Sequence, residues 1–305
     1  MDKRSIKKLF KLPLAELAAL ADKTRNEFAG PKIDLCNILN AKSGLCGEDC
    51  KFCAQSGRHS TAASKYPLKT DKEILTAARS AKEMGADRFD IVTSGNVLTV
   101  SEIERIAGCI SEIRKTIGIK MCASLGKLDE KSLRLLKRSG LSRYHHNIET
   151  SPRYFKKIVT THSFEDRVKT IKAAKKAGLE VCSGGIIGMG ETWLDRIEMA
   201  LLLKKLNVDS VPINILVPIK GTPLQNIRVI SAMDIIKTIA LFRIILKGKT
   251  IKIAAGRESA LKDRQAAAFM AGANGMLIGG YLTIKGRALA EDRKLVEEIK
   301  TAWKR

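Results

Sequence analysis

Three cysteines, Cys46, Cys50 and Cys53, stand in the spacing Cys-x3-Cys-x2-Cys within a stretch of eight residues. Three thiolates so close together can bind one face of a 4Fe–4S cubane, because soft sulfur ligands suit iron–sulfur sites. One of the four irons then has no protein ligand and can chelate a small molecule. The alternative is a structural zinc site with His59 or another cysteine as fourth ligand, but such sites usually pair two cysteine knuckles in a small module. The spacing therefore favours an iron–sulfur cluster.

The composition is that of a soluble globular protein, with 305 residues, 45% of them hydrophobic and 29% charged. No apolar run approaches the roughly 20 residues that span a bilayer, and the first residues do not form an apolar signal core. In a cytosolic enzyme, thiols bind metals or act in catalysis more often than they form disulfides. We therefore expect a cytoplasmic enzyme with no membrane partner.

The net charge of +23 raises the question of nucleic acid, because a positive field attracts polyanions. The basic residues are dispersed along the chain, however, and aromatic residues make up only 5%. No stretch interleaves aromatic and basic residues as a stacking surface would. We predict a solvated basic surface and no nucleic-acid partner.

Short β-type runs alternate with longer helical patterns almost from end to end, which indicates a parallel sheet. We expect strands at 33–39, 88–93, 120–124, 143–148, 180–186, 210–216, 251–255 and 275–278. Helices are expected at 72–84, 101–117, 129–139, 164–177, 192–206, 231–246, 259–271 and about 291–303, the second with a Ser101–Glu104 capping box.

This pattern suits an α/β fold of the (β/α)8 TIM-barrel type better than an open sheet. Residues 1–30 are predicted to form one amphipathic helix as an N-terminal extension, and residues 31–305 the barrel domain. The alternative is a doubly wound sheet, suggested by the glycines at 184–190, but their spacing is not Gly-x-Gly-x-x-Gly.

The cysteine motif, with Phe52 before its last cysteine, resembles the signature of the radical S-adenosylmethionine superfamily. Residues 184–191, Gly-x-Ile-x-Gly-x-x-Glu, resemble its adenine-contacting motif. More narrowly, residues 46–56, 144–151, 181–186, 210–214, 220–224 and 255–258 resemble the biotin synthases. That resemblance implies sulfur insertion into dethiobiotin at C6 and C9, with a 4Fe–4S cluster, S-adenosylmethionine and an auxiliary iron–sulfur cluster as sulfur source.

The resemblance also implies roles for individual residues. Residues matching contacts to S-adenosylmethionine are Phe52, Asn147, Glu149, Arg167 and Ile186, and residues matching contacts to dethiobiotin are Asn147, Asn214 and Thr283. The second threonine expected for the substrate carboxylate is replaced by Ile284. Implied partners are a flavodoxin or ferredoxin-type electron donor, the iron–sulfur assembly machinery and a second copy of the chain in a homodimer.

The auxiliary cluster is where the chain departs from the family pattern. Many biotin synthases hold a 2Fe–2S cluster with three cysteines and an arginine, and Cys122, Cys182 and Arg257 match three of these ligands. Asp90 occupies the position of the remaining cysteine on the second strand. We hypothesise that Cys36 on the first strand joins Cys122 and Cys182 instead, with Arg257 nearby.

Three thiolates on a 4Fe cluster would leave an open iron for an extra sulfide, whereas a 2Fe–2S cluster with Asp90 as ligand is the competing version. Cys36 as a small buried hydrophobic residue is the simplest alternative, and Cys109 is interpreted as structural. Another radical enzyme of the same branch, similar to a hydrogenase-maturation protein or methylornithine synthase, remains the second functional hypothesis. Such enzymes do not generally need Cys122 and Cys182.

Overall fold

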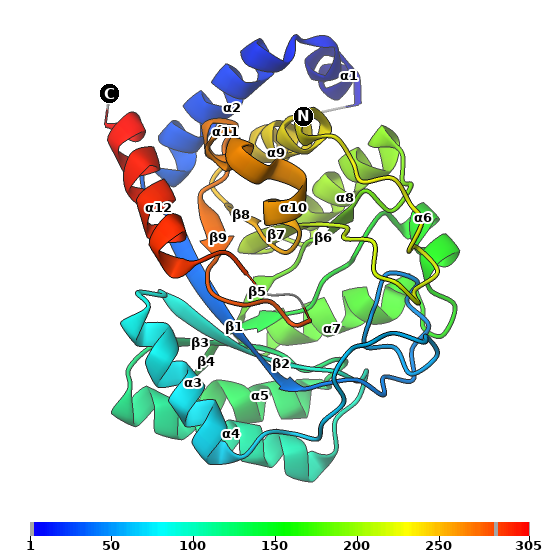
Figure 1. The fold of residues 1–305 in the computed structure, drawn as a ribbon, viewed down its shortest axis with the longest axis vertical. Coiled ribbons are helices and arrows are strands. Elements are labelled where there is room, and N and C mark those ends of the chain that lie inside the picture. The colour runs from blue at the N-terminus through cyan, green and yellow to red at the C-terminus, as the bar shows by residue number, and fades with distance from the viewer. Residues whose placement is uncertain (1–2, 284–285, 305) are drawn as a thin grey trace.

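The strands form a closed parallel barrel in the computed structural model, which describes residues 3–283 and 286–304 (Figure 1). Their order is β5-β4-β3-β2-β1-β9-β8-β7-β6, and an added pairing of β5 with β7 closes the ring. The bounds are β1 Asp34–Lys42, β2 Arg88–Thr93, β3 Lys120–Ser124, β4 Leu141–His145, β5 Glu180–Cys182, β6 Gly185–Ile187, β7 Ser210–Ile215, β8 Thr250–Ile253 and β9 Gly275–Leu277. Because β5 and β6 are two pieces of one stave, the barrel has eight staves, and the predicted (β/α)8 fold is confirmed.

Helices surround the barrel on its outer side (Figure 1). They are α3 Asp71–Glu83, α4 Val100–Thr116, α5 Glu130–Ser139, α6 Pro152–Ile158, α7 Phe164–Lys176, α8 Trp193–Lys205, α9 Ala232–Leu246, α10 Arg257–Leu261, α11 Gln265–Met270 and α12 Leu289–Trp303. The predicted Ser101–Glu104 capping box is wrong by two residues. Thr99 caps α4 and accepts a hydrogen bond from the Glu102 amide, so α4 begins one residue earlier than predicted.

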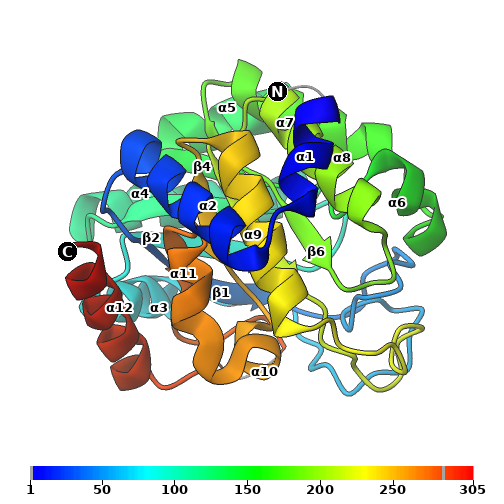
Figure 2. The same cartoon turned by 90° about the horizontal axis from the view of Figure 1, so that it is seen from above.

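Two helices, not the single one predicted, occupy the N-terminal segment: α1 Lys3–Lys11 and α2 Leu14–Ala29. Pro13 separates them, because its ring disfavours helical backbone at Leu12 and fits only the start of the next helix. Figure 2 shows α2 lying across α9, and the two helices are in contact. None of the described helices is both long and apolar enough to cross a bilayer.

The stave predicted as one strand at 180–186 is interrupted at Ser183 and Gly184. A Cβ atom on Gly184 would lie 1.9 Å from the carbonyl oxygen of Pro212 in β7, so only glycine permits this approach. The interruption therefore lies where the fifth stave meets β7 and the ring closes.

Replacing Gly184 with alanine is expected to lower the free energy of unfolding by about 2 kcal/mol, because the added methyl group overpacks the β5–β7 junction. Urea denaturation followed by circular dichroism measures it. Gly108→Ala is the matched control, since a Cβ at this exposed position in α4 meets no atom within 4 Å. It should raise the free energy of unfolding by about 1 kcal/mol. Equal effects of both changes would contradict the packing argument.

Candidate active site

A cavity of about 380 Å³ occupies the barrel and is lined by both inward-facing strand residues and the loop after β1. Inward positions alternate with outward ones along each strand, which brings side chains from separate staves into one space. Six of the seven cysteines belong to this lining: Cys36, Cys46, Cys50, Cys53, Cys122 and Cys182. The seventh cysteine, Cys109, lies on the buried face of α4 and is not part of the lining, in keeping with a structural role.

The first triad, Cys46, Cys50 and Cys53, lies on the loop that follows β1 at the carboxyl ends of the strands. Short backbone hydrogen bonds fold this loop: the Cys53 amide donates to the Cys50 carbonyl at 2.9 Å, and the Gly57 amide donates to the Cys46 carbonyl at 2.7 Å. Burial raises the pKa of the Cys53 thiol to about 11. His59, the alternative zinc ligand, has its Nε2 3.1 Å from the Cys50 carbonyl oxygen.

Acidic residues between Cys46 and Cys50 connect the cysteine loop to the mouth of the barrel by hydrogen bonds. Glu48 accepts hydrogen bonds from Asn96 at 2.6 Å and lies 2.6 Å from His162 Nδ1. Asp49 accepts a hydrogen bond from the amide of Thr160 at 2.9 Å. These contacts tie the loop to the segments after β2 and α6, so the thiols are held by several parts of the chain.

The second triad, Cys36, Cys122 and Cys182, comes from β1, β3 and β5 deeper in the cavity. All three side chains are buried. An interaction with Cys122, together with burial, raises the pKa of the Cys36 thiol, so these two side chains approach each other across β2. All three cysteines that the sequence grouped therefore line one cavity, and two of them, Cys36 and Cys122, approach each other. No three His, Cys, Asp or Glu side chains of residues 3–283 and 286–304 converge as they would around a single metal ion.

Arg257, predicted to lie beside these thiols, does not line the cavity. It is the first residue of α10 and fully buried, with its Nη2 2.7 Å from Asp292 and its Nε donating to Tyr281 at 3.0 Å. The prediction is corrected: β8 ends at Ile253, so the alternation that places strand residues inside the barrel no longer applies at Arg257. Lys252, inside β8, lines the cavity together with Arg143 and Arg167, and it is a residue that the sequence patterns did not single out.

Lys252 belongs to a buried layer of charges beneath the second triad. Its Nζ lies 2.6 Å from Asp34 Oδ1. Arg88 and Arg143 each lie 2.9 Å from the same carboxylate oxygen of Glu180, and Arg88 lies 3.6 Å from Asp34. Three cations face two carboxylates in this layer, and Asp90 adds a further carboxylate next to Cys36 and Cys122. The alternating pattern of β1 and β8 was the signal that could have identified it.

Two sequence profiles match consecutive parts of the chain: the Radical SAM superfamily at residues 42–215, and the Biotin and Thiamin Synthesis associated domain at residues 212–301. Biotin synthase of Thermotoga neapolitana is 57% identical over 270 residues, which cover 88% of this chain and 96% of that relative. Biotin synthase of Thermotoga petrophila is 52% identical, with coverage of 97% and 98%. The chain belongs to the biotin synthase family.

Solved structures share the fold at lower identity. Methylornithine synthase superposes with a TM-score of 0.83 at 20% identity, covering 98% of this chain and 92% of that one. An FeFe-hydrogenase maturase from Carboxydothermus hydrogenoformans gives 0.78 at 22% identity, with coverage of 97% and 77%. At these identities the likeness concerns the fold alone, whereas the close sequence relatives are biotin synthases.

Membership of the biotin synthase family makes the chain a radical S-adenosylmethionine enzyme that inserts sulfur, with a 4Fe–4S cluster and an auxiliary iron–sulfur cluster. The donor set fits both groups, because six soft thiol ligands stand in two triads along one cavity.

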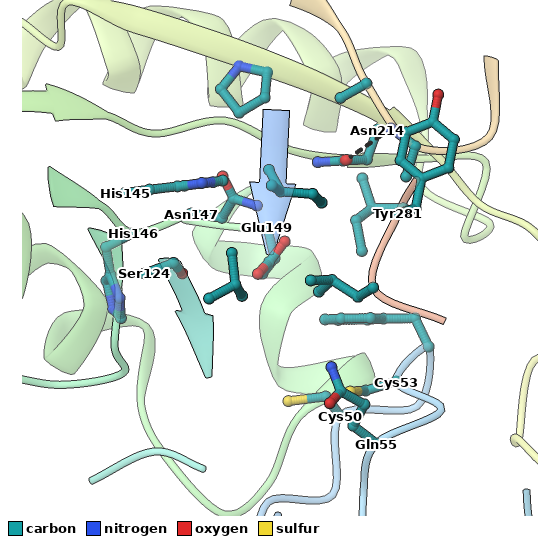
Figure 3. A pocket seen from close by; sticks show the side chains of 18 of the residues that line it. Cys50, Cys53, Gln55, Ser124, His145, His146, Asn147, Glu149, Asn214 and Tyr281 are labelled. Atoms are coloured by element: carbon teal, nitrogen blue, oxygen red, sulfur yellow. Dashed lines mark hydrogen bonds between the residues drawn. The ribbon is translucent and has the colours of Figure 1, made fainter. Parts of the chain in front are cut away.

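Residues predicted to contact S-adenosylmethionine, namely Phe52, Asn147, Glu149, Arg167 and Ile186, all line this cavity. Figure 3 shows Asn147 and Glu149 in the middle of the view, with Cys50 and Cys53 at its lower end. Arg167 donates to the Asn147 carbonyl at 3.0 Å and lies 3.5 Å from Glu149, whose pKa is raised by burial.

The geometry of Asn147 and Glu149 differs from the prediction. A strand was predicted at 143–148, but β4 ends at His145, and Glu149 has a left-handed backbone with φ of 67°. The Glu149 amide donates to the Gly184 carbonyl, and the Glu149 carbonyl accepts from the Ile186 amide at 2.8 Å. A turn stabilised by the fifth stave therefore places both side chains in the cavity.

Residues predicted to contact dethiobiotin, Asn214 and Thr283, line the same cavity with Asn147. Asn214 is fixed by two backbone contacts: its Oδ1 accepts from the Ala255 amide at 3.2 Å, and its Nδ2 donates to the Gly185 carbonyl at 3.3 Å. Ile284 lies outside the described residues.

Removing the carboxylate that holds Arg257 tests its structural role. Asp292→Ala leaves the guanidinium buried without its partner and should lower the free energy of unfolding by about 3 kcal/mol. The Mössbauer spectrum of the auxiliary cluster in the folded protein should stay unchanged. Lys252→Met, in contrast, should alter that spectrum, because Lys252 lines the cavity. Glu297→Ala, which breaks an exposed pair with Lys300, is the control and should cost less than about 1 kcal/mol. An altered Mössbauer spectrum of the auxiliary cluster in Asp292→Ala would indicate that Arg257 lies at the cluster and would contradict this correction.

Proposed function

We propose that the protein converts dethiobiotin to biotin and that each cysteine triad holds one of the two iron–sulfur clusters that this reaction needs. Cys46, Cys50 and Cys53 hold the 4Fe–4S cluster that binds S-adenosylmethionine, and Cys36, Cys122 and Cys182 hold the auxiliary cluster. The observation that carries this proposal is that both triads line one cavity. When bound, these groups supply the 5′-deoxyadenosyl radical that removes hydrogen from C9 and C6 of the substrate, and the sulfur that is inserted.

The protein's part in this reaction is to bind, orient and exclude water. Arg167 and Glu149 offer a cation and a carboxylate at the cofactor end, which suit the methionyl carboxylate and the ribose hydroxyls. Asn147 and Asn214 offer amides for the ureido ring of dethiobiotin, and Thr283 offers a hydroxyl for its carboxylate. The half-buried Phe52 and Ile186 side chains complete the apolar lining for the nucleoside.

The auxiliary cluster in this proposal is of the 4Fe type, with an open iron for an extra sulfide. A 2Fe–2S cluster with Asp90 as ligand is the competing version. The presence of Cys36, Cys122 and Cys182 in the cavity lining supports the first, because these thiols supply three soft ligands without Asp90. Lys252, 2% exposed and close to Cys36, supplies a positive charge for an anionic cluster.

The proposal includes the setting of the enzyme: a cytoplasmic location, a flavodoxin or ferredoxin-type electron donor, iron–sulfur assembly proteins that load both clusters, and a homodimer. Reduced thiols at six cavity positions suit a reducing compartment. Residues 1–30 are proposed as an extension of the barrel domain formed by residues 31–305, supported by the packing of α2 on α9 and α11.

Anaerobic incubation of the loaded protein with S-adenosylmethionine, reductant and dethiobiotin tests the function. We expect 5′-deoxyadenosine together with biotin or a thiolated intermediate, measured by liquid chromatography and mass spectrometry. Formation of 5′-deoxyadenosine without any sulfur-containing product would reject sulfur insertion and favour another radical enzyme of the same branch.

Cys36→Ala tests the ligand set of the second triad. If Cys36 binds a 4Fe auxiliary cluster, the iron content should fall from about eight to about four per chain, while the cluster that binds S-adenosylmethionine keeps its spectrum. Cys109→Ala is the matched control, because this buried thiol lies outside the cavity. Mössbauer spectroscopy and iron analysis measure both. An unchanged auxiliary signal in Cys36→Ala would show that Cys36 is not a ligand of the auxiliary cluster and would favour the version with Asp90.

A further inference from the structure

Asp90 lines the cavity, and only one of its two carboxylate oxygens has a hydrogen-bond partner among the described residues. The side chain is 3% exposed, and its Oδ2 lies 3.1 Å from His145 Nδ1. Its Oδ1 is buried and has no hydrogen-bond partner among the described residues. A buried carboxylate oxygen without a donor is costly, so such an atom in a ligand cavity indicates a missing donor.

His145 connects Asp90 to a second cavity residue, Asn147. Its Nε2 lies 3.0 Å from Asn147 Oδ1. That atom also accepts a hydrogen bond from the backbone amide of Gly184 at 3.0 Å, which fixes the orientation of the Asn147 side-chain amide. Both imidazole nitrogens therefore face oxygen atoms, and Nε2 donates to Asn147 Oδ1, because an amide oxygen can only accept.

These contacts fix the direction in which the nitrogen of the Asn147 side-chain amide points. With its oxygen held by His145 and Gly184, the amide can present only its two N–H donors on the opposite side, where Glu149 lies. In Figure 3, the side chains of His145 and Asn147 lie next to each other. Asp90, His145 and Asn147 all line the cavity, so it presents a free acceptor on Asp90 and an oriented donor on Asn147.

A cyclic urea complements such a pair, because it carries N–H donors on both sides of a carbonyl acceptor. We propose that Asp90 and His145 form a substrate-recognition pair: Asp90 Oδ1 accepts a hydrogen bond from a ureido N–H of dethiobiotin, and His145 orients Asn147 to donate to the ureido carbonyl. This inference rests on the proposed function, in which dethiobiotin is the substrate. Asp90 contacts the substrate, and His145 is a positioning residue.

Substrate analogues test the contact without relying on turnover. The probes are dethiobiotin and its two cyclic carbamates, in each of which one ureido N–H is replaced by oxygen. The loaded wild-type protein with S-adenosylmethionine should bind one carbamate about 10- to 100-fold more weakly than dethiobiotin, as measured by anaerobic calorimetry, because a hydrogen bond to a carboxylate is lost. The comparison within the wild-type protein does not depend on any variant folding.

Asp90→Asn should abolish this preference. The asparagine side chain carries an NH2 donor in place of one of the two carboxylate oxygens, so it no longer offers only acceptors. Asp87→Asn is the matched control: Asp87 just precedes β2, and its carboxylate accepts from the Leu35 amide outside the cavity. It should keep the wild-type preference. Equal binding of all three probes by the wild-type protein, or a preference retained in Asp90→Asn, would overturn the inference while leaving the proposed function intact.

Two further outcomes separate the inference from its rivals. An altered auxiliary Mössbauer spectrum in Asp90→Asn would identify Asp90 as a cluster ligand and overturn the inference. A wild-type protein that binds no dethiobiotin would overturn both this inference and the proposed function.

The positioning role of His145 is tested by measuring KM and kcat separately in two variants. His145→Leu should raise KM for dethiobiotin about 10-fold and change kcat little, because it releases the Asn147 amide. His145→Gln, which keeps a side-chain donor, should restore part of the loss. An equal fall of kcat in both variants with unchanged KM would contradict a positioning role.

Discussion

Lys252 and Asp34 form a buried ion pair at the amino-terminal end of the barrel, with Nζ and Oδ1 2.6 Å apart. Buried charges are tolerated only when they are paired, so this contact and its extension through Arg88, Arg143 and Glu180 determine how the staves meet. The pair joins β8 to β1 across β9, and the extension reaches β2, β4 and β5. The layer places charged side chains, rather than apolar ones, directly beneath the second cysteine triad.

The cations of this layer and the Asp90 carboxylate together form the electrostatic environment of the thiols above it. Thiols in an apolar cavity resist ionisation, whereas iron requires thiolates as ligands. The thiol of Cys36 shows this resistance, since its pKa is raised by its neighbour Cys122 and by burial. A buried cation such as Lys252 favours the ionised state of nearby thiols without contributing a ligand. The arginine expected from the family pattern, Arg257, instead joins α10 to α12 through Asp292.

The mouth of the cavity is organised differently. Its cysteines lie on a loop that is held by backbone hydrogen bonds and by Glu48 and Asp49, which contact residues more than 45 positions away in the sequence. Loop and staves thus face each other across one cavity, with Asn147 and Glu149 between them (Figure 3). This division suits a reaction in which a radical formed at the mouth must reach a substrate placed against a second cluster.

The sequence by itself predicted the eight staves and most of the helices between them from local periodicity, and the first triad from its spacing. The residues along the cofactor end came from the resemblance to the biotin synthases, whereas α6 and the division of the N-terminal segment into two helices were not predicted. It also grouped Cys36 with Cys122 and Cys182 as inward residues, and these cysteines lie on the alternate staves β1, β3 and β5. Only the tertiary structure decided that Lys252 and not Arg257 lines the cavity, that Glu149 reaches it from a left-handed turn, and that Asp90 contacts His145. These features depend on where strands end and how staves are staggered, which are set by long-range pairing and are not encoded in any single segment.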